Sequence, residues 1–267
     1  MELNKIYNES NLDTMAKMPN DFVDLVVTSP PYDGLRTYNG YSFPFEDIAK
    51  ELYRVIKQGG VVVWIVGDAT IDGSETGTSF KQALYFKEVG FFLHDTMIYE
   101  RVSPFPMDNR YHPSFEYMFI LSKGKPKTFN RLMEKRKATT GGSSFRESNG
   151  DLNPPDEKAK ARIAKANLSD ETSRKNIWKY AVGGANTSKD EIAFEHPAVF
   201  PEKLCAEHIY SWSNEGDLVY DCFGGSGTTG KMAHIHRRDW ILSEISKEYC
   251  EIAEKRIATY LAQMSLF

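Results

Sequence analysis

Short apolar runs recur along the chain and predict the strands of one buried sheet. The runs VDLVV (23–27) and GVVVWIVG (60–67) are continuous and rich in β-branched residues. Strands that are buried on both faces of a parallel sheet show this pattern, whereas half-exposed strands alternate apolar and polar residues. The predicted strands are 23–27, 60–67, 95–100, 115–122, 217–221 and 239–244.

Between these strands, apolar residues recur with helical spacing. The first predicted helix, 44–57, runs into KQGG, where we expect glycine to end it. The predicted helices are 44–57, 78–88, 202–213, 227–236 and 246–263. Strands that alternate with helices favour a doubly wound α/β fold with a mostly parallel sheet.

Residues 124–190 break this alternation. The stretch KATTGGSSFRESNGDLNPPDEK is rich in Gly, Ser, Asn and Pro, and we expect no strand of the sheet within the segment. A loop of this length is unusual in a compact domain unless it is functional. We therefore interpret 124–190 as an insertion between two halves of one domain, 1–123 and 191–267.

Charge also separates the insertion from the rest of the chain. Residues 123–189 hold 16 Lys and Arg against 7 Asp and Glu, although the whole chain has a formal net charge of −4. The asymmetry indicates either a segment that faces a polyanion such as nucleic acid or a solvated surface insertion, and charge alone favours neither.

Composition and cysteine usage predict the cellular setting. With 41% hydrophobic residues the chain has the composition of an ordinary globular protein. No apolar run approaches the roughly 20 residues of a membrane helix, and MELNKIYNES does not resemble a signal peptide. The three cysteines show no C-x-x-C spacing. We therefore expect a cytoplasmic location under reducing conditions.

A glycine-rich turn, DLVYDCFGGSGTTGKM (217–232), follows the fifth predicted strand. Its G-x-G-x-x-G spacing, with Glu244 19 residues after Gly225, is typical of a dinucleotide site in which the acid binds ribose hydroxyls. The same stretch also reads G-x-x-x-x-G-K, the phosphate loop of nucleotide hydrolases. There, however, Met232 replaces the Ser or Thr that would bind magnesium.

All interpretations of this turn share some physical chemistry. Glycines let the backbone approach a ligand closely, and the start of the next helix offers unpaired N–H groups. Asp221 ends the strand, and an acid there suits a cationic group better than a pyrophosphate. A ligand with a ribose and an ammonium group, such as S-adenosylmethionine, fits best, while a dinucleotide-dependent oxidoreductase stays as an alternative.

A second chemical signal is the stop of the first strand at Ser-Pro-Pro-Tyr (29–32). Neither proline donates a backbone hydrogen bond, so the loop is rigid and offers carbonyl groups and a hydroxyl. Such a loop can accept hydrogen bonds from the planar exocyclic amine of cytosine or adenine while Tyr32 stacks on the ring. A base in a duplex reaches such a pocket only when it is flipped out.

TSPPY followed by DCFGGSGTTG resembles the exocyclic-amine DNA methyltransferases of the permuted beta group. In that group the catalytic loop precedes the target-recognition region and the cofactor loop follows it. ELYRVIKQGGVVVWIVGD (51–68), HPAVFPEKL (196–204) and ILSEISKEYCEIAEKRI (241–257) are similar to further segments of these enzymes. In place of the family's usual Gly-Asp near the N-terminus, this chain has Asn8 and Glu9. The resemblance implies a Rossmann-like sheet of seven strands, mostly parallel with one antiparallel strand, and a circularly permuted motif order.

The resemblance also implies a role for individual residues. The catalytic set is Ser29, Pro30, Pro31 and Tyr32; the set that binds S-adenosyl-L-methionine is Glu9, Phe200, Asp221, Phe223, Gly224, Gly225, Gly227 and Glu244; and the DNA-binding set is Arg36, Tyr38, Lys135, Arg136 and Lys137. His112 and Glu116 either approach the target pocket or have a structural role at a strand edge. Asp68 lies near the cofactor or is structural. His196, His234 and His236 have packing or surface roles.

The reaction implied is direct methyl transfer to the amine, which needs alignment of the two groups and no metal. Methylation at carbon-5 of cytosine needs a cysteine nucleophile, which the enzymes of that family present after a proline. None of the three cysteines here follows a proline. In the family that the chain resembles, enzymes with Ser at the position of Ser29 often methylate cytosine-N4, and enzymes with Asp there mostly methylate adenine-N6. We therefore favour cytosine-N4, with adenine-N6 as the alternative. A methyltransferase for RNA or protein and a non-catalytic DNA-binding module are further alternatives.

The partners expected from the resemblance are double-stranded DNA, a second copy of the chain in a homodimer, and a restriction endonuclease encoded as a separate protein. No membrane partner is expected. The host is a bacterial or phage-infected cell.

Overall fold

The computed structural model describes residues 1–31, 43–102, 111, 113–135, 145–146, 152–153, 157–158, 171–181, 183, 186–196 and 198–264. The chain divides into two compact units. The first comprises 1–130 and 176–267, and the second comprises 131–175. In the described part of the chain, no helix combines the length and the apolar character needed to cross a membrane.

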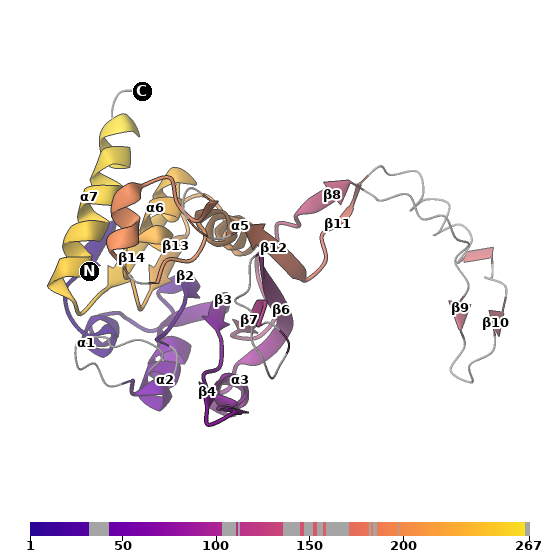
Figure 1. Cartoon of the computed structure of the whole chain (residues 1–267). Coiled ribbons are helices and arrows are strands. Elements are labelled where there is room, and N and C mark those ends of the chain that lie inside the picture. Colours follow the sequence, from indigo (N-terminus) through magenta and orange to yellow (C-terminus); the bar gives the residue numbers. More distant parts are fainter. Residues whose placement is uncertain are drawn as a thin grey trace. The chain divides into compact units, whose positions relative to one another are not determined.

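The first unit is built on a sheet of eight strands among the described residues (Figure 1). In spatial order these are β1 (Lys5–Tyr7), β14 (Asp239–Ser243), β13 (Leu218–Asp221), β2 (Val23–Thr28), β3 (Ile56–Val66), β7 (Phe115–Ser122), β6 (Phe92–Val102) and β12 (Ile177–Ala181). Strand β7 runs antiparallel to both of its neighbours, and every other pair is parallel. The predicted mostly parallel α/β sheet with one antiparallel strand is therefore confirmed, with eight strands where seven were expected.

Strand β12 corrects the expectation that 124–190 holds no strand of the sheet. It pairs in parallel with β6, so that Trp178 lies opposite Tyr99. Trp178 and Tyr180 are buried while Ile177, Lys179 and Ala181 are exposed. This alternation is that of a strand with one solvated face, and a pattern of only five residues is easily missed beside continuous apolar runs.

The glycine stop expected at KQGG is also wrong. Helix α2 (Phe45–Val55) ends before this sequence, and β3 begins at Ile56 and runs through it. The N–H of Gly59 donates to the carbonyl of Lys123, and the N–H of Lys127 donates to the carbonyl of Gly59. A Cβ at Gly59 would lie 2.9 Å from Lys127 Cβ. The glycine thus allows the segment after β7 to approach the strand rather than ending the helix.

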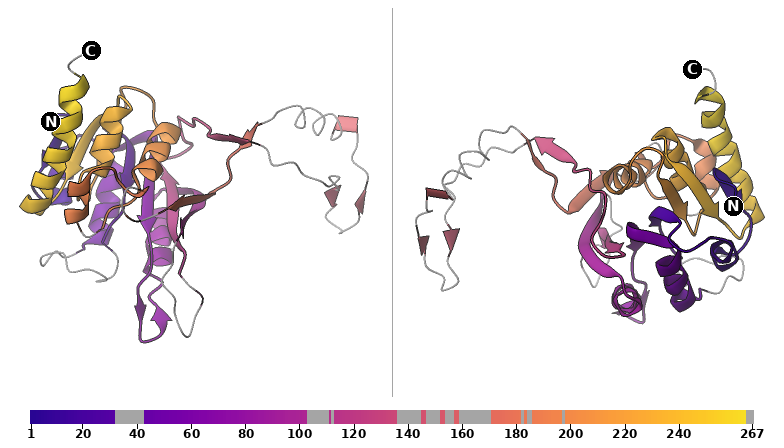
Figure 2. Two further views of the ribbon diagram at one scale, coloured as in Figure 1. Left: turned by 45° about the horizontal axis from the view of Figure 1, so that its top comes forward. Right: turned by 180° about the vertical axis from the view of Figure 1, so that it is seen from behind.

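Helices cover both faces of the sheet (Figures 1 and 2). One layer holds α1 (Asn11–Ala16), α2 and α3 (Thr78–Val89), and the other holds α5 (Glu202–Trp212), α6 (Thr228–Ile235) and α7 (Lys247–Met264). A 3₁₀ turn, η2 (Glu191–Glu195), and a hairpin of β4 (Thr70–Ile71) and β5 (Ser74–Glu75) complete the described elements of this unit. The five predicted helices are confirmed, and α1 was not predicted.

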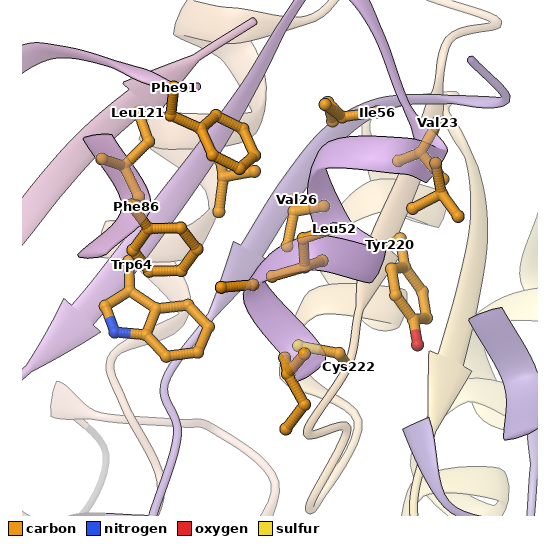
Figure 3. Packing of buried hydrophobic residues seen from close by; sticks show 14 of the residues in the cluster. Val23, Val26, Leu52, Ile56, Trp64, Phe86, Phe91, Leu121, Tyr220 and Cys222 are labelled. Carbon is orange, nitrogen blue, oxygen red and sulfur yellow. The ribbon is translucent and has the colours of Figure 1, made fainter. Parts of the chain in front are cut away.

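The main core lies between the sheet and the α1–α3 layer (Figure 3). Val26 and Trp64 point into it from β2 and β3, because alternate residues of a strand face the same side. The rings of Trp64 and Phe86 lie edge to face with centroids 5.1 Å apart, and Trp64 Nε1 donates to Gln82 Oε1 at 2.8 Å. Burial of each large apolar side chain contributes roughly 1.5–3 kcal/mol. This core holds the strand ends that form the site.

In the second unit, β8 (Met133–Lys135) pairs antiparallel with β11 (Glu171–Ser173), and β9 (Phe145–Arg146) pairs antiparallel with β10 (Leu152–Asn153). Lys135 is exposed on β8. Of the other residues expected to contact DNA, Arg36, Tyr38, Arg136 and Lys137 lie outside the described residues.

Candidate active site

The topology places a crevice between β13 and β2. From β13 the chain passes through α6 to β14 on one side, whereas from β2 it passes through α2 to β3 on the other side. Ligands of open α/β sheets bind outside the carboxyl ends of two such adjacent strands, where the connections diverge. A cleft of about 1160 Å³ lies there.

The cleft brings together residues of both sequence signals. From the catalytic and cofactor sets, it is lined by Glu9, Ser29, Pro30, Pro31, Phe200, Phe223, Gly224, Gly225 and Glu244. Tyr32 and His112 lie outside the described residues. The glycine loop and the Ser-Pro-Pro loop, which are almost 200 positions apart in the sequence, therefore share one cavity.

Asp221 lies behind the wall of this cleft rather than in it. Its side chain is only 1% exposed. Oδ1 accepts hydrogen bonds from Thr28 Oγ1 (2.6 Å) and from the N–H of Phe223 (3.0 Å), and Oδ2 accepts from Thr229 Oγ1 (2.7 Å). Burial raises the pKa of this carboxyl group above its ordinary value, although the hydrogen bonds oppose the shift. The carboxylate joins the end of β2 to the glycine loop and to the start of α6.

Glu244, just after β14, organises the glycine loop from the opposite side. Its Oε2 accepts from the N–H of Gly225 and its Oε1 from the N–H of Ser246, both at 2.8 Å. Burial raises the pKa of Glu244, against the effect of these backbone hydrogen bonds. Each carboxylate oxygen has a second lone pair that can accept from a hydroxyl group of a ligand.

The N-terminal acid lies at the same end of the cleft. Asn8 Nδ2 donates to the carbonyls of Glu244 and Ile245, both at 3.0 Å, which fixes the end of β1 against the end of β14. The carboxylate of Glu9 accepts from Thr14 Oγ1 at 3.0 Å and pairs with Lys17. The departure from Gly-Asp therefore leaves the acid in the cleft wall.

Lys231 overturns the phosphate-loop interpretation. Its side chain is 2% exposed, and its ammonium group lies 2.7 Å from both Asp190 Oδ2 and Glu202 Oε1. A phosphate-loop lysine must reach phosphates from the ligand side of the loop. Because both acids hold its ammonium group in the interior, Lys231 stabilises the packing around α6 and does not line the cleft.

Arg256 completes this buried ionic cluster. Its guanidinium group pairs with Asp190 (3.1 Å) and Glu202 (2.8 Å), and its Nη1 donates to the carbonyl of Ser226 (2.6 Å) and to Thr228 Oγ1 (3.2 Å). The arginine of α7 thus supports the glycine loop from behind. The sequence predicted a helix at this position and no role for Arg256.

His196 is a cleft residue that the sequence did not single out for function. It is 8% exposed, its Nδ1 accepts from the N–H of Ala198 (3.1 Å), and its ring packs edge to face on Tyr249 with centroids 4.3 Å apart. A Cβ at Gly225 would lie 3.1 Å from His196 Nε2. His196 thus has the packing role predicted for it, and it packs against Tyr249 and the glycine loop at Gly225.

Of the two roles expected for Asp68, near the cofactor or structural, the structure shows the structural one. Its Oδ1 accepts from the N–H of Ser79 (2.9 Å), and its Oδ2 accepts from Ser79 Oγ (2.5 Å). Thr76 and Thr78 also donate to Oδ1. Asp68 therefore caps the start of α3, and it does not line the cleft. Glu116, by contrast, does line it.

Sequence comparison identifies the family. The sequence profile of the N6 and N4 methyltransferases, described as DNA methylase, matches residues 23–255. The chain belongs to this family. It is also 57% identical over 246 residues to the orphan methyltransferase M.BamHII of Bacillus amyloliquefaciens, an alignment that covers 90% of each chain.

Solved structures share the fold. The cytosine-N4-specific PvuII DNA methyltransferase matches with a TM-score of 0.68 and 22% identity, covering 97% of this chain and 91% of that one. A complex of M1.HpyAVI with S-adenosyl-L-methionine matches with a TM-score of 0.61 and 21% identity, covering 95% and 98%. At these identities the likeness concerns the fold.

The protein is thus an S-adenosyl-L-methionine-dependent DNA methyltransferase, and the oxidoreductase alternative is wrong. The cleft fits this cofactor. Its volume is about 1160 Å³, and it presents a glycine loop, an acid at the next strand end and the half-buried ring of Phe200.

Substitution of Gly225 by alanine is expected to weaken binding of the cofactor. Its φ is +48°, so alanine costs about 1 kcal/mol of folding free energy, and the new methyl group would press on His196. Gly216→Ala is the matched control, because φ is +82° and nothing lies within 4 Å of its Cβ. We expect Gly225→Ala to lose at least as much stability as Gly216→Ala in thermal melts, and only Gly225→Ala to lose about tenfold in affinity for S-adenosyl-L-methionine by calorimetry. Equal affinities would show that the loop tolerates the methyl group.

Proposed function

We propose that this enzyme methylates the N4 amine of a flipped cytosine in double-stranded DNA. The observation that carries the proposal is the shared cleft. The rigid loop Ser29–Pro31 and the glycine loop 223–226 line it together, at the ends of adjacent strands. The preference for cytosine over adenine rests on Ser29, as the family resemblance implies, and adenine-N6 is the alternative.

The residues of the Ser-Pro-Pro loop would receive the amine. The Ser29 hydroxyl and the Pro30 carbonyl accept its N–H groups, while Tyr32 stacks on the ring. The lone pair of a planar amine is delocalised into the ring, which makes the amine a poor nucleophile. Positive charge develops on nitrogen as the amine attacks the methyl group, and fixed oxygen acceptors stabilise that charge. The methylated amine then loses one N–H proton to solvent. The cofactor supplies an activated methyl group on its sulfonium, and the loop fixes the approach of the amine to it.

Cofactor binding would use the other end of the cleft. Glu244 would accept from the ribose hydroxyls while holding Gly225, and the loop Phe223–Gly227 would cradle the methionine part. A Cβ at Gly227 would lie 2.7 Å from Ala253 Cβ, so the turn requires glycine there. Glu9 and Phe200 contribute to the adenosine pocket.

DNA and other partners belong to the same proposal. Arg36 and Tyr38 would contact the duplex beside the catalytic loop, and Lys135, Arg136 and Lys137 would contact phosphates, which fix position without reading sequence. A homodimer, a restriction endonuclease as a separate protein, and a cytoplasmic location in a bacterial or phage-infected cell complete it.

Mass spectrometry of nucleosides tests the proposed reaction. The protein is incubated with S-adenosyl-L-methionine and unmethylated duplex DNA of varied sequence, and the DNA is then digested. We expect N4-methylcytosine with the wild type and at least a hundredfold less with Tyr32→Ala, because stacking contributes about 1–3 kcal/mol and also aligns the amine. Tyr210→Ala is the matched control, since Tyr210 is 46% exposed on α5 and does not line the cleft.

The other outcomes separate the alternatives. Detection of N6-methyladenine would support the same active site with adenine, rather than cytosine, as the target base. A complete absence of methylated nucleosides, with cofactor binding intact, would reject DNA as the acceptor and direct the same assay to RNA.

A further inference from the structure

The cleft extends beyond the two loops, to a polar wall on β6 and β7. Tyr99 and Arg101 near the end of β6 and Glu116 near the start of β7 line the same cavity as Ser29–Pro31. Tyr99 and Glu116 are opposite each other in the antiparallel ladder. The proposed transfer of the methyl group uses none of these three side chains.

Arg101 is held firmly in this wall. Its Nη1 lies 3.3 Å from Glu116 Oε1, and its Nη2 donates to the carbonyl of Pro113 at 3.1 Å. Its backbone N–H donates to the carbonyl of Ser114 at 2.7 Å. The guanidinium group is therefore oriented before any ligand arrives, which reduces the entropy lost on binding.

Arg101 keeps donors that a ligand can reach. Its Nε is buried and out of a ligand's reach. Nη1 and Nη2 carry two N–H groups each, and the contacts with Glu116 and Pro113 use one on each nitrogen. The side chain is 35% exposed and lines the cleft, so the other N–H groups can donate to an acceptor on the substrate. The glutamate beside it makes the site selective for a neutral acceptor, because an anionic group would be repelled by Glu116.

The two candidate bases differ at this point of their edges. Cytosine presents its amine, then a ring nitrogen, then a carbonyl oxygen, whereas adenine presents its amine, a ring nitrogen and a C–H group. With the amine at Ser29 and Pro30, only the pyrimidine ends in a carbonyl acceptor. An arginine donor in the same cleft that meets this end of the base therefore favours cytosine.

We propose that Arg101 is a specificity-determining residue that donates a hydrogen bond to the 2-carbonyl oxygen of the flipped cytosine, with Glu116 as its positioning residue. This inference rests on the proposed cytosine-N4 activity and deepens it. It assigns the choice of base to β6 and β7 as well as to Ser29.

A substrate analogue isolates the contact. Duplexes carry the recognition sequence, read from DNA that the wild type has modified, with either cytosine or a 2-aminopyridine C-nucleoside at the target. The analogue keeps the ring nitrogen and the exocyclic amine and lacks the carbonyl oxygen. We expect kcat/KM of the wild type to fall about 10- to 100-fold on the analogue, as for a lost charge-assisted hydrogen bond. In Arg101→Met the ratio of kcat/KM on cytosine to kcat/KM on the analogue should fall to about 1.

Two further variants make the result specific. Glu116→Gln should give an intermediate ratio, because its amide oxygen still accepts from the guanidinium group. Lys179→Met is the matched control: Lys179 pairs with Glu100 on the neighbouring strand, is 60% exposed and lies outside the cleft, and should keep the wild-type ratio. Affinity for S-adenosyl-L-methionine, measured by calorimetry, should be unchanged in every variant.

Three results would overturn the inference. If the wild type methylates cytosine and the analogue equally well, the enzyme makes no important contact with the carbonyl oxygen. If Arg101→Met discriminates between the two targets as strongly as the wild type does, another residue makes the contact. If Arg101→Met fails to bind the cofactor, an unchanged ratio in Glu116→Gln likewise rejects the contact. N6-methyladenine as the product, by contrast, would remove the proposed base itself, which is a different failure.

Discussion

Arg256→Met is expected to lower the free energy of unfolding by about 3 kcal/mol. Arg256 is fully buried and pairs with Asp190 and Glu202, so its loss leaves two carboxylates with Lys231 as their shared cation. The carbonyl of Ser226 in the glycine loop loses a donor as well. The midpoint of thermal unfolding should fall by about 6–12 °C. Calorimetric melts at neutral pH measure it.

A surface arginine provides the control. Arg237 lies 3.6 Å from Glu215, and both side chains are more than 60% exposed. Such pairs contribute about 0.2–1 kcal/mol, so Arg237→Met should shift the midpoint by no more than about 4 °C. Equal shifts in the two arginine variants would show that the buried cluster is no more stabilising than a solvated pair.

The cost of Arg256→Met should also depend on pH. Burial raises the pKa of Asp190, but hydrogen bonds from Lys231 and Arg256 outweigh it, so the pKa lies below its ordinary value. A lowered carboxyl pKa contributes stability above the ordinary value of about 4, and this contribution is lost as pH falls through the folded pKa. The difference in stability between wild type and Arg256→Met should therefore narrow below about pH 4.

The sequence predicted the elements whose pattern is local. The six apolar runs became strands and the five periodic segments became helices, because burial on both faces of the sheet demands such runs. Strand β12 escaped prediction because its five residues are stabilised by pairing with β6, far away in the sequence. KQGG was misjudged because the contact of Gly59 with Lys127 involves residues 68 positions apart.

The candidate site was predictable in its loops but not in the direction of its side chains. The glycine turn and the Ser-Pro-Pro loop carry backbone constraints that can be recognised in the sequence. Whether Asp221 faces the ligand depends instead on Thr28, 193 positions away, whose hydroxyl group holds the carboxylate in the interior. Lys231 likewise matches a phosphate-loop pattern. Its ammonium group is paired, however, with Asp190, just before η2, and with Glu202 on α5, and it does not line the cleft.

Asp221→Ala is expected to reduce kcat/KM for methyl transfer by at least about a hundredfold. The substitution removes the acceptor shared by two buried hydroxyl groups, those of Thr28 and Thr229, and by the N–H of Phe223 in the cleft wall. Each buried donor left without an acceptor costs about 1–3 kcal/mol, so the loops must shift to find new partners. Such a shift changes the distance between the Ser-Pro-Pro loop and the cofactor loop. Initial rates with saturating cofactor and varied DNA measure the loss.

The two threonines separate the functions of this carboxylate. Thr28→Val keeps the shape of the side chain and breaks the link between Asp221 and the end of β2, together with a long contact from Cys222 Sγ (3.7 Å). We expect kcat to fall about tenfold while affinity for S-adenosyl-L-methionine stays unchanged. Thr229→Val breaks the stronger link, from α6 to Asp221 (2.7 Å), and a longer contact of the same hydroxyl with the carbonyl of Val27 on β2 (3.3 Å). It should weaken cofactor binding more than it lowers kcat. If Thr28→Val keeps the wild-type kcat, then Asp221 shapes the glycine loop alone, and the position of Ser29 is set by β2 and its neighbouring strands. A split between the two variants would instead show that one buried carboxylate aligns the acceptor loop with the donor loop.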